Sequence, residues 1–230
     1  MRIHNKKEFG LGLAMLTGFF LALFAIFSPI HEGGRNTLDY MDGVFNAISK
    51  HSAYYIPEVA EKAKQHAGTQ ATLAVKAADD KQAARMARLF AAAGAEVAAD
   101  GAQLKLSGDL GRLFDTVLSD ADLMFKNDSA AVSAKYGEDG RQVLYDWHKA
   151  LSAMAKDLNK QEKYSEAKTL RDIQTKAVEP AYNYYGIEAV PMTSMLWIAL
   201  AALIGYVVYT IWYGFAILFL FEGWGLKLDH

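Results

Sequence analysis

The longest uncharged stretch in the chain, residues 189–221, sets the first limit on its fold. It reads AVPMTSMLWIALAALIGYVVYTIWYGFAILFLF and lies between Glu188 and Glu222. About 20 apolar residues in a helix cross the roughly 30 Å core of a bilayer, so this stretch predicts a membrane-spanning helix. As one helix it would extend about 50 Å, which is more than one crossing needs. We therefore interpret residues 191–222 as a span with a juxtamembrane extension; a neighbouring helix that covers the excess apolar length fits equally well.

A second uncharged stretch, FGLGLAMLTGFFLALFAIFSPI, covers residues 9–30 and is long enough for one crossing. Basic residues precede it, as they do in a secretory signal peptide. Its apolar part is longer than the core of a typical signal peptide, however, and FSPIHEGG offers no small-x-small cleavage site. The chain has no cysteine, which excludes lipoprotein processing. We expect an uncleaved anchor, and hence two spans that enclose residues 31–190.

Basic residues beside the first span predict its orientation, because Lys and Arg are retained on the cytoplasmic side of a membrane. The basic residues before this span are Arg2, Lys6 and Lys7. Its far end has only Arg35, which stands among acidic residues. We therefore expect residues 1–8 and 223–230, including Lys227, to be cytoplasmic. Residues 31–190 then face outward, which in a bacterium describes a two-pass protein of the inner membrane with a periplasmic domain.

Composition excludes some classes of partner and cofactor. The formal net charge is −2 at pH 7, and no basic cluster marks a surface for nucleic acid or anionic lipid. The absence of cysteine excludes structural disulfides, c-type haem attachment and thiolate metal sites. The partners that we expect are the lipid bilayer and either other membrane subunits or further copies of the chain, with no nucleic acid.

The outward segment begins and ends with helical patterns. Apolar residues at helical spacing run through residues 36–67, where Asn36 or Thr37 caps the first helix and Pro57 starts the second. The same spacing returns in residues 129–186, where one apolar stripe consists of Val143, Leu144, Trp147, Leu151 and Met154. We expect these two parts to form a helical stalk that continues into the spans.

Strand patterns occur between these helical parts, in residues 70–126. A strand over 71–77 is followed by a helix over 79–94 that Asp79 or Asp80 caps, a hairpin that turns at Asp100-Gly101, and a further helix that Asp109 opens. The order β-α-β-β-α is most of a ferredoxin-like unit. Residues 130–134 either supply its last strand or begin the next helix. The predicted class is a membrane protein, mainly α, with a small α/β head on the stalk.

Catalytic and cofactor motifs are absent from the sequence, which contains no GxxxxGK[ST], no GxGxxG after a strand, no HExxH and no GxSxG. No histidine falls inside a span, so a haem b site there is not expected. We interpret His31 and His51 as interfacial polar residues rather than a metal or quinone site, and Asp120 in DADLMFKND as a solvated acid at a helix end. Asp146 and His148 point to different helix faces. We expect no catalytic residue, no metal and no cofactor, and hence no enzyme.

Small residues recur on the first span at intervals of four, a spacing that lets another helix approach closely. The members of this stripe are Gly10, Ala14, Gly18 and Ala22, and the second span carries the pair Ala201 and Gly205. Three phenols follow at spacings of three and four: Tyr206, Tyr209 and Tyr213. Since a hydroxyl in hydrocarbon needs a hydrogen-bond partner, we expect this face to pack on protein, unless the helix is displaced so that some phenols reach the headgroups. We predict that these nine residues form helix–helix interfaces, with the other span or with another subunit.

The order of short N-terminal segment, span, outer helical domain and second span resembles the sensing half of bacterial chemoreceptors and sensor kinases. The resemblance is one of topology, and no sequence motif accompanies it. It implies an outward domain that detects a ligand. EGWGLKLDH, which follows the second uncharged stretch, contains no kinase or signalling helix. We therefore assign the chain to neither family.

These features favour a noncatalytic accessory or scaffolding subunit of an inner-membrane complex with a respiratory, transport or secretion role. Such a subunit docks its partners through its spans and its outer domain. The alternative is a periplasmic ligand-binding sensor or regulator that signals through a separate membrane partner. No motif supports a membrane-anchored enzyme. The apolar stretches of the two spans contain no charged residue, which disfavours a transporter that acts alone.

Overall fold

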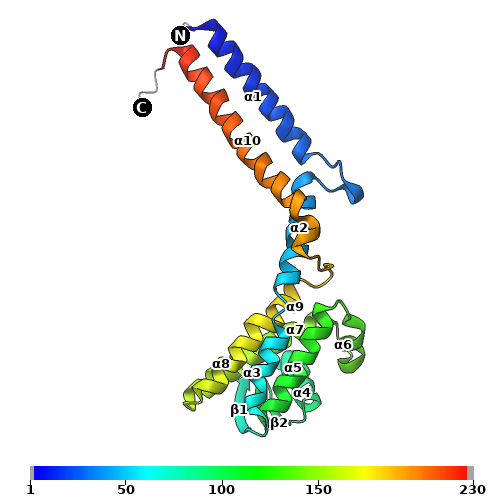
Figure 1. Ribbon diagram of the computed structural model, residues 1–230. Helices are drawn as coiled ribbons and strands as arrows, with labels where there is room; N and C mark the ends of the chain where they lie inside the picture. The colour runs from blue at the N-terminus through cyan, green and yellow to red at the C-terminus, as the bar shows by residue number, and fades with distance from the viewer. Residues whose placement is uncertain (1–2, 227–230) are drawn as a thin grey trace. The chain divides into compact units, whose positions relative to one another are not determined.

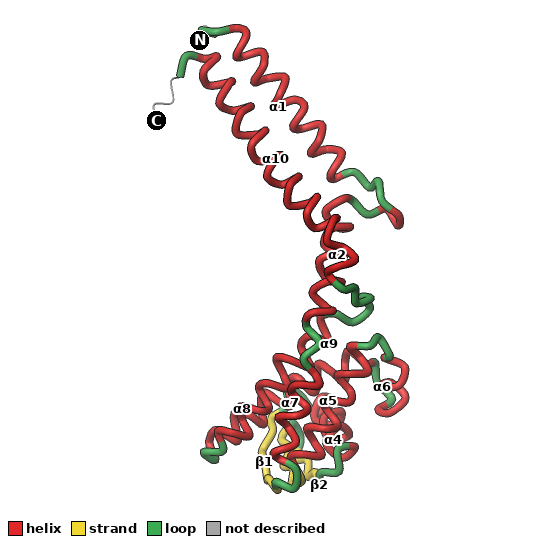
Figure 2. The backbone as a smooth tube through the Cα atoms, viewed as in Figure 1, coloured by secondary structure: helices red, strands yellow, loops and turns green. Residues whose placement is uncertain are grey.

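The computed structural model describes residues 3–226, so Arg2 and Lys227, on which the predicted orientation depends in part, lie outside the described residues. The described chain is mostly helical and contains one three-stranded sheet (Figures 1 and 2). It divides into two units, Met1–Ser49 with Ala189–His230 and Lys50–Glu188, and each is treated by itself. Residues 31–49, which the sequence places in the outward segment, group with the two long helices.

The first unit is built on two long antiparallel helices, α1 (Lys6–Phe27) and α10 (Met192–Trp224), which lie side by side in Figure 1. The side chain of Asn5 caps α1 by accepting hydrogen bonds from backbone N–H groups of its first turn. The helix α10 ends at Gly225, whose φ of 85° gives the left-handed conformation typical of a helix end. The carbonyl of Gly223 also accepts from the backbone N–H groups of His4 (2.9 Å) and Asn5 (3.0 Å). The start of one helix therefore covers the end of the other.

Among the described residues, α1 and α10 are the two helices long and apolar enough to cross a membrane. The 22 residues of α1 extend about 33 Å, and the 33 residues of α10 extend about 50 Å without interruption. The juxtamembrane extension that we expect within residues 191–222 is thus part of the same helix, which begins at Met192, directly after Pro191. Between the two helices in sequence lie the 3-10 turn η1 (Glu32–Gly34) and α2 (Thr37–Ser52), and Asn36 caps α2 by accepting from the N–H of Asp39 (2.9 Å).

The second unit joins the sheet to seven α-helices and two further turns. Its elements, in chain order after the end of α2, are α3 (Ile56–Ala63), η2 (Lys64–His66), β1 (Gln70–Lys76), α4 (Asp80–Ala92), β2 (Glu96–Asp100), β3 (Gln103–Asp109), α5 (Leu110–Phe125), α6 (Ser129–Tyr136), α7 (Gly140–Lys160), α8 (Tyr164–Ile173), the π-helical turn η3 (Gln174–Val178) and the short α9 (Glu179–Asn183). The predicted caps Asp79 and Asp109 accept hydrogen bonds from Gln82 N–H (2.8 Å) and Gly111 N–H (2.8 Å). Residues 130–134 lie in α6 and form no strand.

The sheet has the order β1-β3-β2, and β3 runs antiparallel to both neighbours. Buried and exposed residues alternate along β1, so one face of the sheet is covered and the other is open. The outer edge of β1 is closed by side chains at the C-terminal end of α7: Asp157 accepts from Ala74 N–H (3.0 Å), and Gln161, which follows the helix, donates to the carbonyl of Thr72 (3.0 Å). These bonds satisfy edge groups that a fourth strand would otherwise pair.

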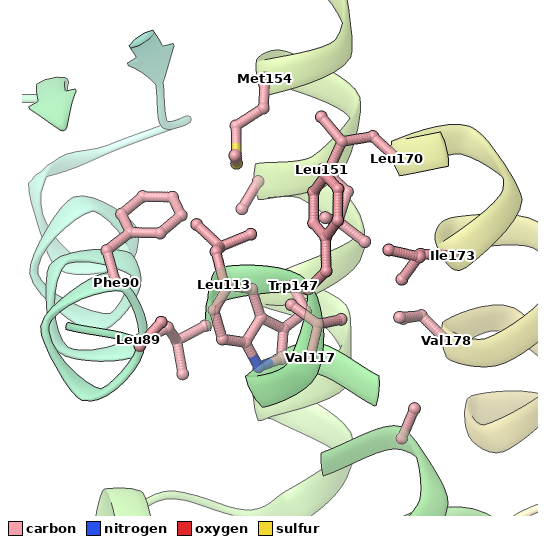
Figure 3. Close-up of a cluster of buried hydrophobic side chains, with 14 of the residues drawn as sticks. Leu89, Phe90, Leu113, Val117, Trp147, Leu151, Met154, Leu170, Ile173 and Val178 are labelled. Carbon is pink, nitrogen blue, oxygen red and sulfur yellow. The ribbon is translucent and has the colours of Figure 1, made fainter. Parts of the chain in front are cut away.

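One hydrophobic core holds the second unit together (Figure 3). Figure 3 shows side chains from α4, α5, α7 and α8 meeting around the fully buried Trp147. The stripe predicted on α7 faces this core, and its members Val143, Leu144, Trp147, Leu151 and Met154 are all buried. The expected division into a stalk and a separate head is therefore not observed. In a separate stalk, the apolar faces of α3, α7 and α8 would cover only one another. Here the sheet and α5 cover them as well.

Candidate functional site

The contact between α1 and α10 depends on glycines that permit a close approach. A Cβ added to Gly12 would stand 2.6 Å from the backbone nitrogen of Leu220 and 2.9 Å from the carbonyl oxygen of Ala216. A Cβ on Gly223 would stand 2.5 Å from the backbone nitrogen of Phe9. The indole N–H of Trp212 donates to the carbonyl of Met15 across the pair (3.1 Å). Close backbone packing, this hydrogen bond and the bonds to the Gly223 carbonyl therefore hold the two helices together.

Some of the predicted interface residues lie in this contact. A Cβ on Gly18 would meet the Trp212 ring at 3.1 Å. The rings of Tyr209 and Tyr213 pack on Phe19, with centroid distances of 4.7 and 5.0 Å, and Phe19 is buried. Ala22 is partly buried.

Other predicted interface residues point away from this contact. The exposed ones are Gly10, Ala14, Ala201, Gly205 and Tyr206. Within residues 3–226, nothing lies within 4 Å of the Cβ positions of Gly10 and Gly205. The contact between α1 and α10 does not cover these residues.

The sequence analysis missed the glycines that form the contact. Gly12 and Phe19 are seven residues apart, as are Ala216 and Gly223, and this is the repeat of helices packed along a seam. That spacing was the available signal. The four-residue stripe was more visible, but small residues alone do not show which face of a helix meets which neighbour.

A buried carboxylate organises the side of the second unit where α5, α6 and α7 meet. Asp120 is fully buried and accepts hydrogen bonds from Tyr136 Oη (2.5 Å), Trp147 Nε1 (2.9 Å) and Lys135 Nζ (2.9 Å). The interpretation of Asp120 as a solvated acid is therefore wrong, because α6 and α7 fold over it. Burial, together with the hydrogen bond to Asp120, raises the pKa of Tyr136.

Asp146 and His148 lie apart, as their helix spacing predicts. Asp146 is buried and binds Arg85 through Nε (2.5 Å) and Nη2 (3.3 Å), with Gln82 Nε2 at 3.0 Å. His148 instead faces η3 and α9. Asp120 and Asp146 thus each join helices of the second unit through several hydrogen bonds.

The π-helical turn η3 brings two polar side chains onto His148. The backbone N–H of Glu179 donates to the carbonyl of Gln174, five residues earlier, and the next residue, Pro180, has no N–H to continue an α-helical pattern. His148 Nε2 stands 3.1 Å from Glu179 Oε1 and 2.8 Å from Gln174 Nε2, and Gln174 Nε2 also reaches Ser152 Oγ (2.8 Å). In an α-helix, residues five apart lie about 140° apart around the axis. The wider π-helical turn places Gln174 and Glu179 on the same side of the helix, where both face His148.

A groove opens beside this cluster, between α7 and the segment formed by η3 and α9. It has a volume of about 300 Å³, and its lining consists of Leu144, Tyr145, His148, Lys149, Val178, Glu179, Tyr182 and Asn183. A neighbouring hollow shares Tyr145 and Tyr182 and adds Arg141. Lys149 Nζ stands 5.2 Å from the ring centroid of Tyr145, and the Arg141 guanidinium stands 4.8 Å from that of Tyr182. The groove thus combines an apolar floor, two phenol rings and two cations.

A second polar cluster joins the first and last residues of the second unit. Lys50 is buried and donates to Asn127 Oδ1 (2.9 Å) and to the carbonyl of Ile187 (2.6 Å). Asn127 also donates to the Ile187 carbonyl (3.0 Å) and accepts from the N–H of Gly186 (2.8 Å). Burial lowers the pKa of Lys50, and Glu188 opposes that change. We call these residues the Asn127 clasp.

The described residues contain no group of three or more His, Cys, Asp or Glu side chains placed to hold a metal ion. His31 stacks on Tyr40, with ring centroids 4.8 Å apart, and its Nε2 lies 3.2 Å from Thr37 Oγ1. Comparisons of the chain with protein-family models, with curated proteins and with solved structures found no match.

Proposed function

We propose that the chain is a noncatalytic accessory subunit of an inner-membrane complex, which it joins through α1 and α10. The observation that supports this proposal is the outer surface of the pair formed by α1 and α10. Each helix covers one face of the other, and the remaining faces expose large apolar side chains, with Phe24 75% and Trp197 79% exposed. Apolar surface of this extent requires lipid or other helices around it.

The exposed small residues favour helices as part of that surrounding. Gly10 and Ala14 lie on the face of α1 opposite Gly12, and Gly205 lies open on α10. At such positions a neighbouring backbone can approach as closely as α10 approaches Gly12. The excess length of α10 over α1 offers further apolar surface to a partner.

The proposal includes the topology and the class of the second unit. Residues 31–190 face the periplasm and both chain ends the cytoplasm. The sheet with α4 and α5 is a ferredoxin-like unit in which Asp157 and Gln161 replace the fourth strand. The β-α-β-β-α order and the placement of β3 between β1 and β2 support this interpretation.

The test is purification of the full chain from native membranes in a mild detergent, with mass spectrometry and a native mass of the intact species. We expect other membrane subunits in fixed stoichiometry. Gly10→Leu combined with Ala14→Leu should abolish their recovery, while Leu11→Ala, a change to an exposed neighbour on α1, should not. A lone chain, a homo-oligomer, or equal recovery with the double variant would contradict the proposal.

A further inference from the structure

We propose that the groove between α7 and α9 binds a small aromatic carboxylate. The polar and aromatic side chains that line this groove are Tyr145, His148, Lys149, Glu179 and Tyr182, and Arg141 lies in the neighbouring hollow at one end. Such binding goes beyond the proposed subunit role, which depends on α1 and α10, and it stands on contacts within the second unit alone.

The size and lining of the groove suit a small planar molecule. A volume of about 300 Å³ lies at the lower end of the range for ligand sites. Its floor includes Leu144 and Val178, whereas Tyr145 and Tyr182 present phenol rings. Phenol rings stack favourably on other aromatic rings, which gives the ligand its aromatic body.

The charges indicate the sign of the ligand. Among the described residues, the contacts seen for Arg141 and Lys149 at the groove are with tyrosine rings, and no carboxylate forms an ion pair with either. They stand eight residues apart on α7, about 12 Å along one face. The one carboxylate that lines the 300 Å³ groove, Glu179, already pairs with His148. Asp139, which lines the neighbouring hollow with Arg141, accepts from the backbone N–H groups of Arg141 and Gln142 at the start of α7. Both nearby carboxylates are thus engaged, whereas the two cations have no charged partner within residues 3–226, so an anionic group is favoured, and a carboxylate matches the Arg and Lys donors.

The π-helical turn η3 determines how the polar side of the groove is arranged. Such turns occur frequently at functional sites. Here the turn directs Gln174 and Glu179 at the same nitrogen of His148. That nitrogen cannot donate to Glu179 and accept from Gln174 at once, so the cluster holds two competing arrangements. A bound carboxylate that accepts from a group in this cluster would select one of them.

The experiment is isothermal titration of the full chain in lipid nanodiscs with 2-naphthoate, with empty nanodiscs subtracted to remove partition into lipid. The neutral amide 2-naphthamide serves as the matched probe. We expect saturable binding of the carboxylate and at least tenfold weaker binding of the amide. Lys149→Gln and Arg141→Gln should each weaken 2-naphthoate binding about tenfold, and Tyr182→Leu should weaken both probes.

The control variant is Lys156→Gln, which removes an exposed cation from α7 outside the groove. It should bind 2-naphthoate as the unmodified chain does. Absence of saturable binding, equal affinity for the amide, or an equal loss with Lys156→Gln would overturn the proposal. Protection of the groove from hydrogen exchange by a co-purified subunit, without any binding of 2-naphthoate, would assign the groove to a protein partner and overturn it as well.

Discussion

At the scale of single residues, the second unit is organised by polar side chains that are buried with full sets of partners. Asp120 accepts from three donors, and Asp146 from Arg85 and Gln82. A buried carboxylate is tolerated only when its hydrogen bonds are made, and each remaining donor matters more when one is lost. Substitutions among these donors should therefore have unequal and measurable effects.

Tyr136→Phe removes one donor from Asp120 and leaves Trp147 and Lys135 in place. We expect the free energy of unfolding at pH 7 to fall by about 2 kcal/mol. Because the pKa of Tyr136 is raised in the folded state, its contribution is complete below pH 10 and is lost as pH rises further, when the unfolded tyrosine ionises first. Urea unfolding followed by near-UV circular dichroism should show the difference between the two proteins shrinking above pH 10. A constant or widening difference would refute this account.

Lys50→Met and Asn127→Ala should differ sharply in the Asn127 clasp. The two acceptors of Lys50 keep other donors when Lys50 is replaced: Asn127 Oδ1 keeps Gly186 N–H, and the Ile187 carbonyl keeps Asn127 Nδ2. The lowered pKa shows that burial penalises the charge, so Lys50→Met should change stability by less than about 1 kcal/mol.

Asn127→Ala, in contrast, leaves Gly186 N–H without this acceptor and Lys50 with fewer partners, at a position whose φ is 65°. A loss of about 3 kcal/mol or more is expected. The same urea experiment tests both variants, and comparable losses would contradict the distinction.

At the scale of elements, the decisive feature is which face of α1 meets α10. Gly12→Leu would drive a side chain into the backbone of Leu220, whereas Gly10→Leu would meet nothing within 4 Å among residues 3–226. We expect Gly12→Leu to separate the helix pair and Gly10→Leu to leave it intact.

The absence of cysteine allows a direct readout of that prediction. In a His4→Cys, Gly225→Cys background the two Cβ atoms would start 3.1 Å apart, a few tenths of an ångström closer than a disulfide spans, so a small outward shift at the end of α10 brings them to that separation. Oxidative cross-linking should persist with Gly10→Leu and fall strongly with Gly12→Leu. Equal cross-linking in both would show that the contact does not depend on Gly12.

Local signals in the sequence were sufficient for most elements, but not for the candidate site. Asp79 and Asp109 mark helix starts through hydrogen bonds to N–H groups of their own first turns, and Pro57 marks one through its fixed φ. Asp100-Gly101 turns its hairpin, so these features needed no knowledge of the fold. The burial of Asp120 depends on α6 and α7, which follow it in the chain. A period of 3.6 residues likewise does not reveal a π-helical turn, although Pro180 was a signal that a turn there departs from α geometry.

At the scale of the whole molecule, the proposed topology makes a prediction about accessibility. Ser107→Cys lies on the open face of the sheet, and Ile3→Cys lies before α1. In spheroplasts of an expressing bacterium, a membrane-impermeant maleimide should label position 107 and should label position 3 only after lysis. Labelling of position 3 in intact spheroplasts, with position 107 protected, would reverse the orientation.

The Asn127 clasp has a further consequence for how such a chain can change. Lys50 and Ile187, where the chain enters and leaves the second unit, are joined by a hydrogen bond of 2.6 Å, and in the first unit the N–H of Val190 donates to the carbonyl of Ala47 (3.1 Å). Each unit therefore has its two connection points next to each other, the arrangement that permits one domain to be inserted into another. The second unit therefore has the connections of an inserted domain. Because α2 (Thr37–Ser52) runs through the entry point at Lys50, we expect exchange for another domain with adjacent ends to preserve the path of the chain on either side only when the last turn of α2 is kept.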